Sequence, residues 1–198
     1  MSRWRKMSED ERKQELKRRQ IARHPMHSPR HYDSGRRIYL VTAACYEHRP
    51  HIGFSDARMD HFADTLRSLI ADHCERLDAW VVLPNHYHVL VLTDDLTGFL
   101  KQLGRMHGCM AHAWNGEENS RGRKVWCNAV ERKIQNDRHH VAAMQYIHHN
   151  PVKHGRAGKW TDWKWSGASE YIQQIGRDEA ERRWREYPLH LFGKGWDD

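Results

Sequence analysis

Two histidines stand one residue apart inside an apolar stretch of the chain. His86 and His88 flank Tyr87 in the segment WVVLPNHYHVLVLT, whose composition is typical of a β-strand. Side chains alternate between the two faces of a strand, so both imidazoles should point to the same side. Such a pair can supply two ligands to one metal ion. The alternative is a pair of half-buried histidines that hydrogen-bond to their neighbours.

A tyrosine and an amide lie one helical turn apart later in the chain. Tyr146 and Asn150 fall within the segment QYIHHNP, which the spacing of apolar residues predicts to be helical. At about 100° per residue, both side chains point away from the apolar stripe of this helix, which comprises Val141, Met144 and Ile147. The alternative is a surface tyrosine at the end of a helix.

Taken together, these residue types indicate cleavage of a phosphodiester. A divalent ion can act as a Lewis acid on a non-bridging phosphate oxygen. A tyrosine hydroxyl is a weak nucleophile at neutral pH, and a nearby cation would activate and orient it. Attack would store the phosphodiester energy in a phosphotyrosine bond, and the sequence contains no Walker-type nucleotide-binding loop. Imidazole and amide ligands suit Zn²⁺ or Co²⁺ better than Mg²⁺ or Mn²⁺, so the metal stays open.

The composition describes a polar chain with its excess positive charge at one end. Net charge is +7, and residues 1–30 hold ten Lys and Arg against four acidic residues, a net of +6. Such a segment favours a polyanion such as nucleic acid, and the alternative is a solvated basic helix. No apolar run is long enough to span a membrane and no secretory signal is present, which predicts a cytoplasmic protein.

The pattern of apolar and turn residues predicts an α+β fold. Ser8 and Glu11 form a capping box for a basic helix over 8–22. Predicted strands cover 38–46, 78–83, 87–93 and 125–134, and predicted helices cover 57–76, 96–114 and 136–150, where Pro151 ends the last one. This order is a ferredoxin-like β-α-β-β-α-β antiparallel sheet with an extra helix, which carries Tyr146 and covers the other face. We expect a basic extension and linker over 1–35, the main domain over 36–171 and a tail over 172–198 that packs on it.

Two motifs give the chain a specific resemblance. LPNHYH at 83–88 and YIHHNPVKHG at 146–155, with RHHV just upstream of the second and WKWS downstream, resemble the REP-associated tyrosine transposases. These form the single-tyrosine branch of the HUH nuclease superfamily, and the resemblance covers residues 36–171. It implies a ferredoxin-like catalytic domain that cleaves single-stranded DNA at repetitive extragenic palindromes folded as hairpins. We expect the protein to be a monomer or homodimer.

The resemblance assigns roles to particular residues. His86, His88 and Asn150 would bind a divalent metal, with Mg²⁺ or Mn²⁺ expected, and Tyr146 would be the nucleophile. Cleavage would leave a 5′-phosphotyrosine and a free 3′-OH. The chain departs from the family in the adjacent imidazoles at 148 and 149, which could compete for the metal, and in its long basic N-terminal extension.

Candidate DNA contacts are less specific. Arg121, Arg123 and Lys124 lie in a predicted loop, and Lys153 and Arg156 follow the helix that carries the tyrosine. They could hold phosphates near the site, and the alternative is solvated surface charge. Two other functions fit the same fold: a module that binds hairpin DNA or RNA without chemistry, and a replication or conjugation initiator. The paired His-x-His and Tyr-x-x-x-Asn spacings favour the enzyme.

Overall fold

The computed structural model describes residues 35–186 and the isolated positions 8, 10, 11 and 14. The chain divides into two compact units, Met1–Tyr32 and Asp33–Asp198. In the first unit, the Glu11 amide donates to Ser8 Oγ at 3.2 Å and the Ser8 amide donates to a Glu11 carboxylate oxygen at 2.6 Å. The predicted capping box is therefore confirmed, whereas the remainder of the predicted helix and the last twelve residues of the predicted tail lie outside the described residues.

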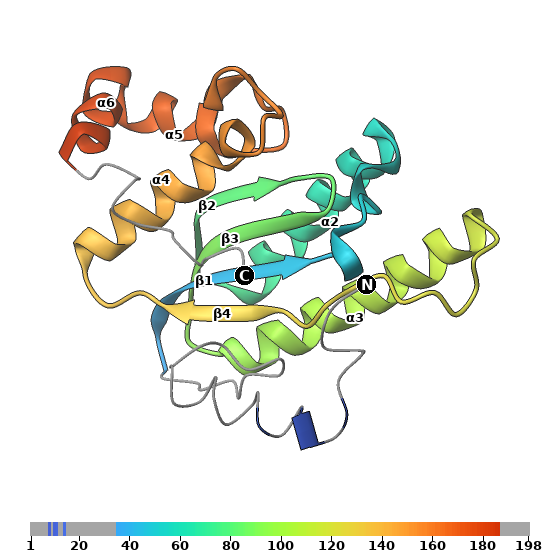
Figure 1. Cartoon of the computed structure of the whole chain (residues 1–198). Coiled ribbons are helices and arrows are strands. Elements are labelled where there is room, and N and C mark those ends of the chain that lie inside the picture. The colour runs from blue at the N-terminus through green and yellow to red at the C-terminus, as the bar shows by residue number, and fades with distance from the viewer. Residues whose placement is uncertain (1–7, 9, 12–13, 15–34, 187–198) are drawn as a thin grey trace. The chain divides into compact units, whose positions relative to one another are not determined.

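Four antiparallel strands form the sheet of the second unit (Figure 1). They are β1 (Arg37–Ala44), β2 (Arg76–Val82), β3 (His86–Thr93) and β4 (Val130–Lys133), in the order β2-β3-β1-β4. Every residue of β3 is buried, as its unbroken apolar sequence requires for a central strand covered on both faces. This order of strands and helices is the ferredoxin-like arrangement that the sequence predicted, so the predicted fold class is confirmed.

The last strand is much shorter than the predicted 125–134. Thr42 of β1 pairs with Val130, whereas Cys45 pairs with Trp126, so the register slips by one residue between these two pairs. A slip of this kind leaves an unpaired residue and interrupts the ladder of hydrogen bonds. The segment before β4 therefore runs beside the end of β1 without forming a regular strand.

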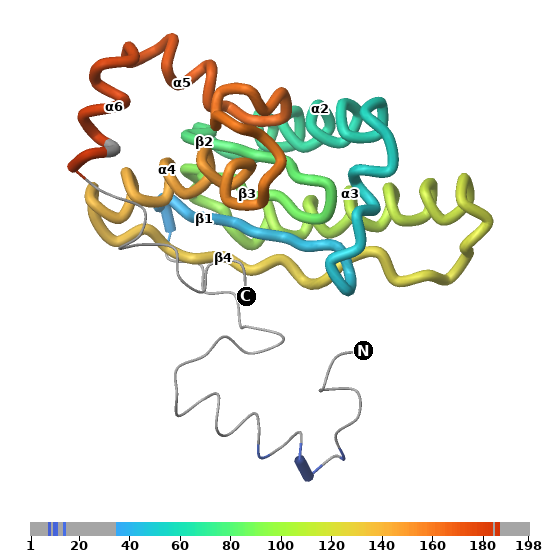
Figure 2. The backbone as a smooth tube through the Cα atoms, turned by 45° about the horizontal axis from the view of Figure 1, so that its top comes forward, coloured from blue at the N-terminus to red at the C-terminus, as the bar shows by residue number. Residues whose placement is uncertain are grey.

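Helices cover both faces of the sheet (Figures 1 and 2). On one face lie α2 (Asp56–His73) and α3 (Leu96–Glu117), whose N-caps are Ser55 and Asp95. On the other face lies α4 (Asp137–Lys153), whose N-cap Asn136 accepts a hydrogen bond from the His139 amide. The strands bury alternate residues in two separate cores, with Tyr87 facing α2 and α3, and Leu90 facing α4.

Helix α4 continues three residues beyond the predicted end at Asn150. The expectation that Pro151 ends the helix is wrong, because the helix runs to Lys153 and the amides of His154 and Arg156 still donate to carbonyls of the last turns. Pro151 removes one backbone donor. Asn150 and Pro151 are both buried, and this packing keeps the turn helical in spite of the missing hydrogen bond.

Short elements complete the second unit. Two 3₁₀ turns, η2 (Tyr46–His48) and η3 (Ile52–Phe54), follow β1, and a third, η4 (Trp160–Asp162), follows α4. Two helices, α5 (Ala168–Ile175) and α6 (Arg177–Glu186), then lie beside α4 (Figure 1). Across residues 35–186, no helix has the length and apolar character needed to cross a membrane.

Candidate active site

The two histidines lie at the start of β3, next to the middle of the sheet. His86 and His88 are opposite Ala44 and Thr42 of β1 in the antiparallel register. Both side chains point to the α4 face as predicted, with ring centroids 5.1 Å apart and rings nearly perpendicular. Both are buried, so each imidazole has left water and needs polar partners inside the protein.

Hydrogen bonds from neighbouring residues orient both rings. His88 Nδ1 lies 2.7 Å from Thr42 Oγ1, and His86 Nδ1 lies 2.8 Å from Asn85 Oδ1. The Asn85 amide nitrogen donates to the His48 carbonyl at 3.1 Å, so its oxygen must face His86 and accept from Nδ1. When His86 is neutral, its proton is therefore on Nδ1 and its lone pair is on Nε2. This arrangement is the one that metal-binding histidines usually have.

Asn150 faces the lone pair of His86. Its Oδ1 lies 3.1 Å from His86 Nε2, so two acceptors point at each other in a fully buried site. With the amide turned, Nδ2 would donate to His86 Nε2, but Oδ1 would then be buried in the position where Nδ2 now has no hydrogen-bond partner. With the amide as it stands, a positive charge between the two atoms, either a second proton on His86 or a metal ion bound by both, would satisfy both acceptors.

The donor set fits a divalent metal ion. Adjacent ligands of an octahedral ion with bonds of about 2.1 Å lie about 3 Å apart, close to the separation of His86 Nε2 and Asn150 Oδ1. Within residues 35–186, no three His, Cys, Asp or Glu side chains group together as a metal site. An ion bound here would therefore need the Asn150 amide oxygen as well as the two imidazoles.

Tyr146 lies one turn before Asn150 on α4. Its ring is perpendicular to that of His88 with centroids 5.2 Å apart, and Lys153 Nζ lies 5.1 Å from its centroid on the ring face. The expectation that Tyr146 points away from the core is wrong, because its side chain is only 4% exposed and packs with Leu90 and Ile147. The sheet covers one side of α4 and the segment after it covers another, so burial extends beyond the apolar stripe.

The imidazoles that follow Tyr146 point elsewhere. The His148 ring packs against Tyr171 and Trp160, with centroids 5.1 and 6.0 Å away. Burial lowers the pKa of His148 to about 3, so this ring is neutral. His149 lines a separate cavity beside α4. The predicted competition for the metal is therefore not seen in the arrangement of these two side chains.

His154 is a site residue that sequence reasoning missed. It is exposed, and its ring is perpendicular to that of His86 with centroids 4.9 Å apart. Desolvation, followed by the charges of Lys153 and others nearby, lowers its pKa. The signal was present in the sequence, since Tyr146, Asn150 and His154 are spaced by four residues and so lie along one face of α4 and its C-cap.

Comparison with known proteins gives the site a context. No family model matches the chain. A REP-associated tyrosine transposase from Escherichia coli strain K12 is 33% identical over 96 residues, which is 46% of this chain and 52% of that protein. The chain thus spans about half the length of this relative. A solved structure of a REP-associated tyrosine transposase bound to a REP hairpin has a TM-score of 0.55 at 22% identity, covering 85% of this chain and 92% of that one. The predicted resemblance is confirmed in sequence and in fold.

The five basic residues predicted to contact DNA divide into two groups. In the loop after α3, Arg123 donates to Glu118 at 2.7 Å, and this hydrogen bond is the main cause that lowers the pKa of Glu118 to about 2. Arg123 thus holds the loop together. Arg121 and Lys124 are exposed there, although Arg121 also donates to the His112 carbonyl.

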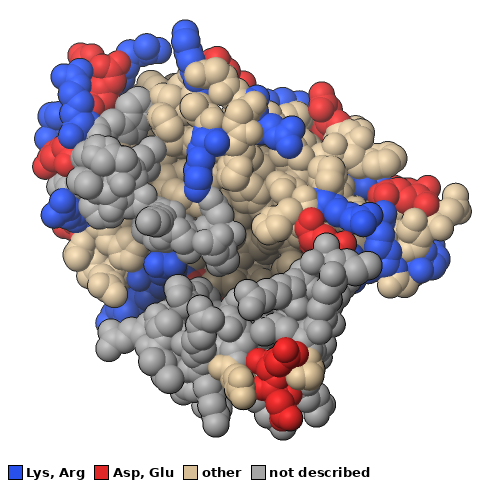
Figure 3. All heavy atoms as spheres, viewed as in Figure 1, with Lys and Arg blue, Asp and Glu red and all other residues tan. Residues whose placement is uncertain are grey.

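The second group lies at the end of α4. Lys153 and Arg156 are both exposed, and Lys153 reaches back over Tyr146. Figure 3 shows Lys and Arg side chains at the upper left, at the top and at the right-hand edge of this face, interspersed with acidic ones. The group at the end of α4 is therefore the better placed of the two to meet a phosphate beside the tyrosine.

Proposed function

We propose that this protein is a metal-dependent, single-strand DNA endonuclease and strand transferase of the transposase kind. Its substrate would be DNA hairpins formed by repetitive extragenic palindromes, in the cytoplasm. The observation that carries the proposal is the buried cluster in which His86 Nε2 lies 3.1 Å from Asn150 Oδ1 and Tyr146 packs against the neighbouring His88. The relatives named above are transposases, and the solved one is bound to a REP hairpin, which supports hairpin DNA as the partner.

The residues of the site would divide the work. His86, His88 and Asn150 would bind the ion, expected to be Mg²⁺ or Mn²⁺, and the bound ion would supply Lewis-acid polarisation of a phosphate oxygen. Tyr146 Oη would attack the phosphorus. The new bond joins this oxygen to phosphorus, and the bond from phosphorus to O3′ breaks. The tyrosine proton passes to solvent, and the leaving O3′ takes a proton from solvent to become the 3′-OH. The product is a 5′-phosphotyrosine, and attack by a 3′-OH would reverse the reaction.

Other side chains would position these groups. Thr42 and Asn85 hold the histidine rings, and Lys153 holds the face of the Tyr146 ring by a cation–π contact. The buried position of Tyr146 would exclude water from a phosphotyrosine and so keep the strand available for rejoining. Lys153 and Arg156 would contact phosphates beside the site, and the protein would act as a monomer or homodimer.

Cleavage of labelled hairpin oligonucleotides tests the proposal. The wild-type protein should cleave them with Mn²⁺ or Mg²⁺ and stop when EDTA is added. His88→Ala should lower the rate of cleavage by at least about 100-fold, because the substitution removes a proposed metal ligand on the α4 face. It should still bind the hairpin, because His88 is buried and the exposed basic residues are unchanged. Cleavage by His88→Ala at the wild-type rate would contradict the proposal.

A second function has one observation in its favour. Tyr146 is nearly inaccessible in this structure, as expected if the protein only binds hairpin DNA or RNA without chemistry. Metal-independent binding of hairpins without any cleavage by the wild-type protein would support this binding module and would overturn the enzyme.

A further inference from the structure

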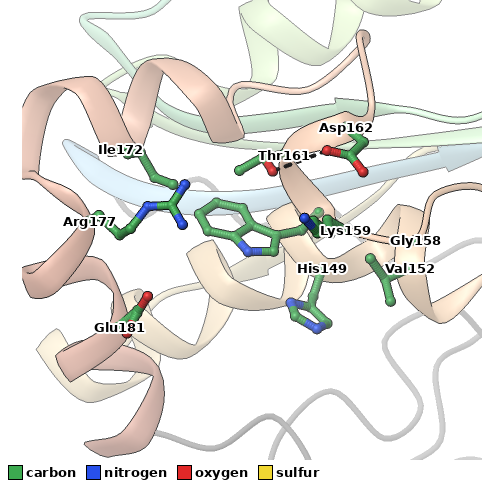
Figure 4. Close-up of a pocket in the computed structure, with 10 residues that line it drawn as sticks. His149, Val152, Gly158, Lys159, Thr161, Asp162, Ile172, Arg177 and Glu181 are labelled. Atoms are coloured by element: carbon green, nitrogen blue, oxygen red, sulfur yellow. Dashed lines mark hydrogen bonds between the residues drawn. The ribbon is translucent and has the colours of Figure 1, made fainter.

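A cavity of about 420 Å³ opens beside α4, away from the paired histidines. Its volume lies within the range of about 300 to 1,000 Å³ that is typical of small-ligand sites. Residues from α4, η4, α5 and α6 line it, including His149 and Val152 of the helix that carries Tyr146 (Figure 4). The cavity is thus built by the elements that follow the ferredoxin-like sheet, and α4 contributes residues both to it and to the candidate active site.

A supported aromatic ring forms part of this cavity. Trp160 lines it, and its indole stacks on the buried His148 ring at an interplanar angle of 25°. His148 packs in turn against Tyr171, so the indole rests on a fixed layer of rings. An indole held in this way can stack on the face of a nucleobase.

The polar groups around the cavity carry both signs of charge. Lys159 and Arg177 are exposed cations, and Asp162 and Glu181 contribute carboxylates. Figure 4 shows Arg177 and Glu181 coming from α6, opposite the segment that holds Thr161 and Asp162. A simple anion would meet as many negative as positive groups here. A nucleotide fits better, because its phosphate can contact the cations while the N–H groups of its base donate to the carboxylates.

The cavity lies within reach of a strand bound at Tyr146. His149 follows Tyr146 by three residues, which is about 4.5 Å along the helix axis and about 60° around it. Lys153 lies between the directions of these two side chains on α4 and is exposed. A phosphate held by Lys153 would therefore place the neighbouring nucleotide near the mouth of the cavity.

We propose that this cavity receives one unpaired nucleobase, together with its phosphate, from the same single strand that Tyr146 attacks. The inference rests on the proposed function, since it names where part of that substrate would bind. It gives the protein a sequence-reading element next to the cleavage position that is separate from recognition of a hairpin stem. Trp160 would stack on the base, and Lys159 and Arg177 would contact the phosphate.

The test measures binding in the Tyr146→Phe background, so that it needs no chemistry. Hairpin oligonucleotides with single-stranded flanks are titrated by fluorescence anisotropy, with an abasic site moved through each unpaired position in turn. At one position, the abasic site should weaken binding about tenfold or more, the range of one lost base–aromatic stack. That loss should disappear when the protein also carries Trp160→Ala, because both changes remove the same contact.

Three further variants control for unfolding and for general effects of charge. Trp160→Phe keeps an aromatic ring and should retain most of the position-dependent loss. Lys159→Ala should weaken binding of the intact oligonucleotide severalfold, whereas Lys101→Ala, an exposed lysine on α3 across the sheet, should not. These exposed lysines can be replaced with little effect on the core.

The outcomes separate the two proposals. Suppose that hairpins bind but every abasic site weakens binding to the same extent with and without Trp160→Ala in the Tyr146→Phe protein. The cavity then does not hold a base, and the inference is overturned while the proposed function stands. If neither the parent nor the wild-type protein binds hairpin or single-stranded DNA at any position, the proposed function fails and this inference fails with it.

Discussion

The partners of the two histidines decide what those histidines can do. Asn85 Oδ1 can only accept from His86 Nδ1, because the Asn85 nitrogen is engaged by the His48 carbonyl. This fixes the His86 lone pair toward Asn150, a consequence that depends on backbone and amide groups rather than on the His-x-His motif itself. The second histidine has an equivalent support in Thr42.

The first prediction concerns that support. Thr42→Val keeps the shape of the side chain but removes the hydroxyl 2.7 Å from His88 Nδ1. Loss of such a partner typically weakens metal binding by about 10- to 100-fold, and we expect this decrease in Mn²⁺ affinity by calorimetric titration. Thr65→Val on α2, whose hydroxyl donates only to the His61 carbonyl, is the matched control and should bind Mn²⁺ like the wild type. Equal affinities for Thr42→Val and wild type would show that Thr42 does not orient a ligand.

Among the elements, the position of α4 has the greatest effect on the geometry of the candidate site. It carries Tyr146 and Asn150, and a buried carboxylate links its first turn to the sheet. Asp78 of β2 accepts hydrogen bonds from His140 at 2.7 Å and from Arg76. Burial raises the pKa of Asp78, but these two hydrogen bonds and charges outweigh burial and hold the pKa below its ordinary value.

The second prediction follows from this link. Asp78→Asn should lower the free energy of unfolding by about 1 to 3 kcal/mol at neutral pH, because hydrogen bonds to a charged acceptor are lost. A group whose pKa is lowered by folding stabilises at pH above its unfolded pKa, and that contribution disappears as pH falls through the folded pKa. Urea unfolding should therefore show a difference in the free energy of unfolding between wild type and variant, and this difference should become smaller as the pH falls.

The control for this prediction is an exposed carboxylate. Asp72→Asn, near the end of α2, should leave the free energy of unfolding within about 0.5 kcal/mol of wild type at every pH. A gap for Asp78→Asn that stays constant down to strongly acidic pH would mean that the loss is one of packing and not of charge.

The sequence predicted the elements well where one pattern governs them. The alternation in β3 placed both histidines on one face, and the spacing of apolar residues in 57–76 predicted the helix α2. These features depend on local side-chain spacing, which survives folding unchanged. The order of elements then left the ferredoxin-like sheet as the natural arrangement.

Features that depend on contacts between distant segments were not predictable. Tyr146 is buried in a core that joins α4 to the sheet and to Tyr171 of α5, and periodicity within α4 cannot show this. Arg123 is paired with Glu118 across a loop whose shape the sequence does not reveal. The short β4 results from a one-residue slip against β1, and the pattern of residues 125–134 gives no sign of it.

At the scale of the whole molecule, positive charge is concentrated near the N-terminus. Residues 1–30 carry a net charge of +6 out of +7 for the whole chain. Charge of this kind adds affinity for any nucleic acid through counterion release and does not distinguish one sequence from another. Sequence discrimination would have to come from the second unit, where the candidate site and the cavity lie.

The third prediction separates these contributions. Changing both Arg18 and Arg19 to Gln should weaken binding of hairpin and non-hairpin DNA by the same factor. The slope of log affinity against log salt should fall by up to about 1.5. Anisotropy titrations at several salt concentrations measure both quantities. The matched pair Lys101 and Arg105, exposed on α3, should leave the slope unchanged when both are replaced by Gln. Loss of hairpin binding alone in the Arg18 and Arg19 variant would contradict this account.

The most direct test of the central claim is a search for the covalent intermediate. The protein is incubated with Mn²⁺ or Mg²⁺ and labelled single-stranded hairpins drawn from palindromes that flank its gene, and the products are run on a denaturing gel. We predict a labelled band at the mass of the protein that disappears with EDTA and in Tyr146→Phe, which should still bind the hairpin. A band that persists in Tyr146→Phe would contradict the assignment of the nucleophile, and tight binding with no band in the wild type would contradict the catalytic role of the site.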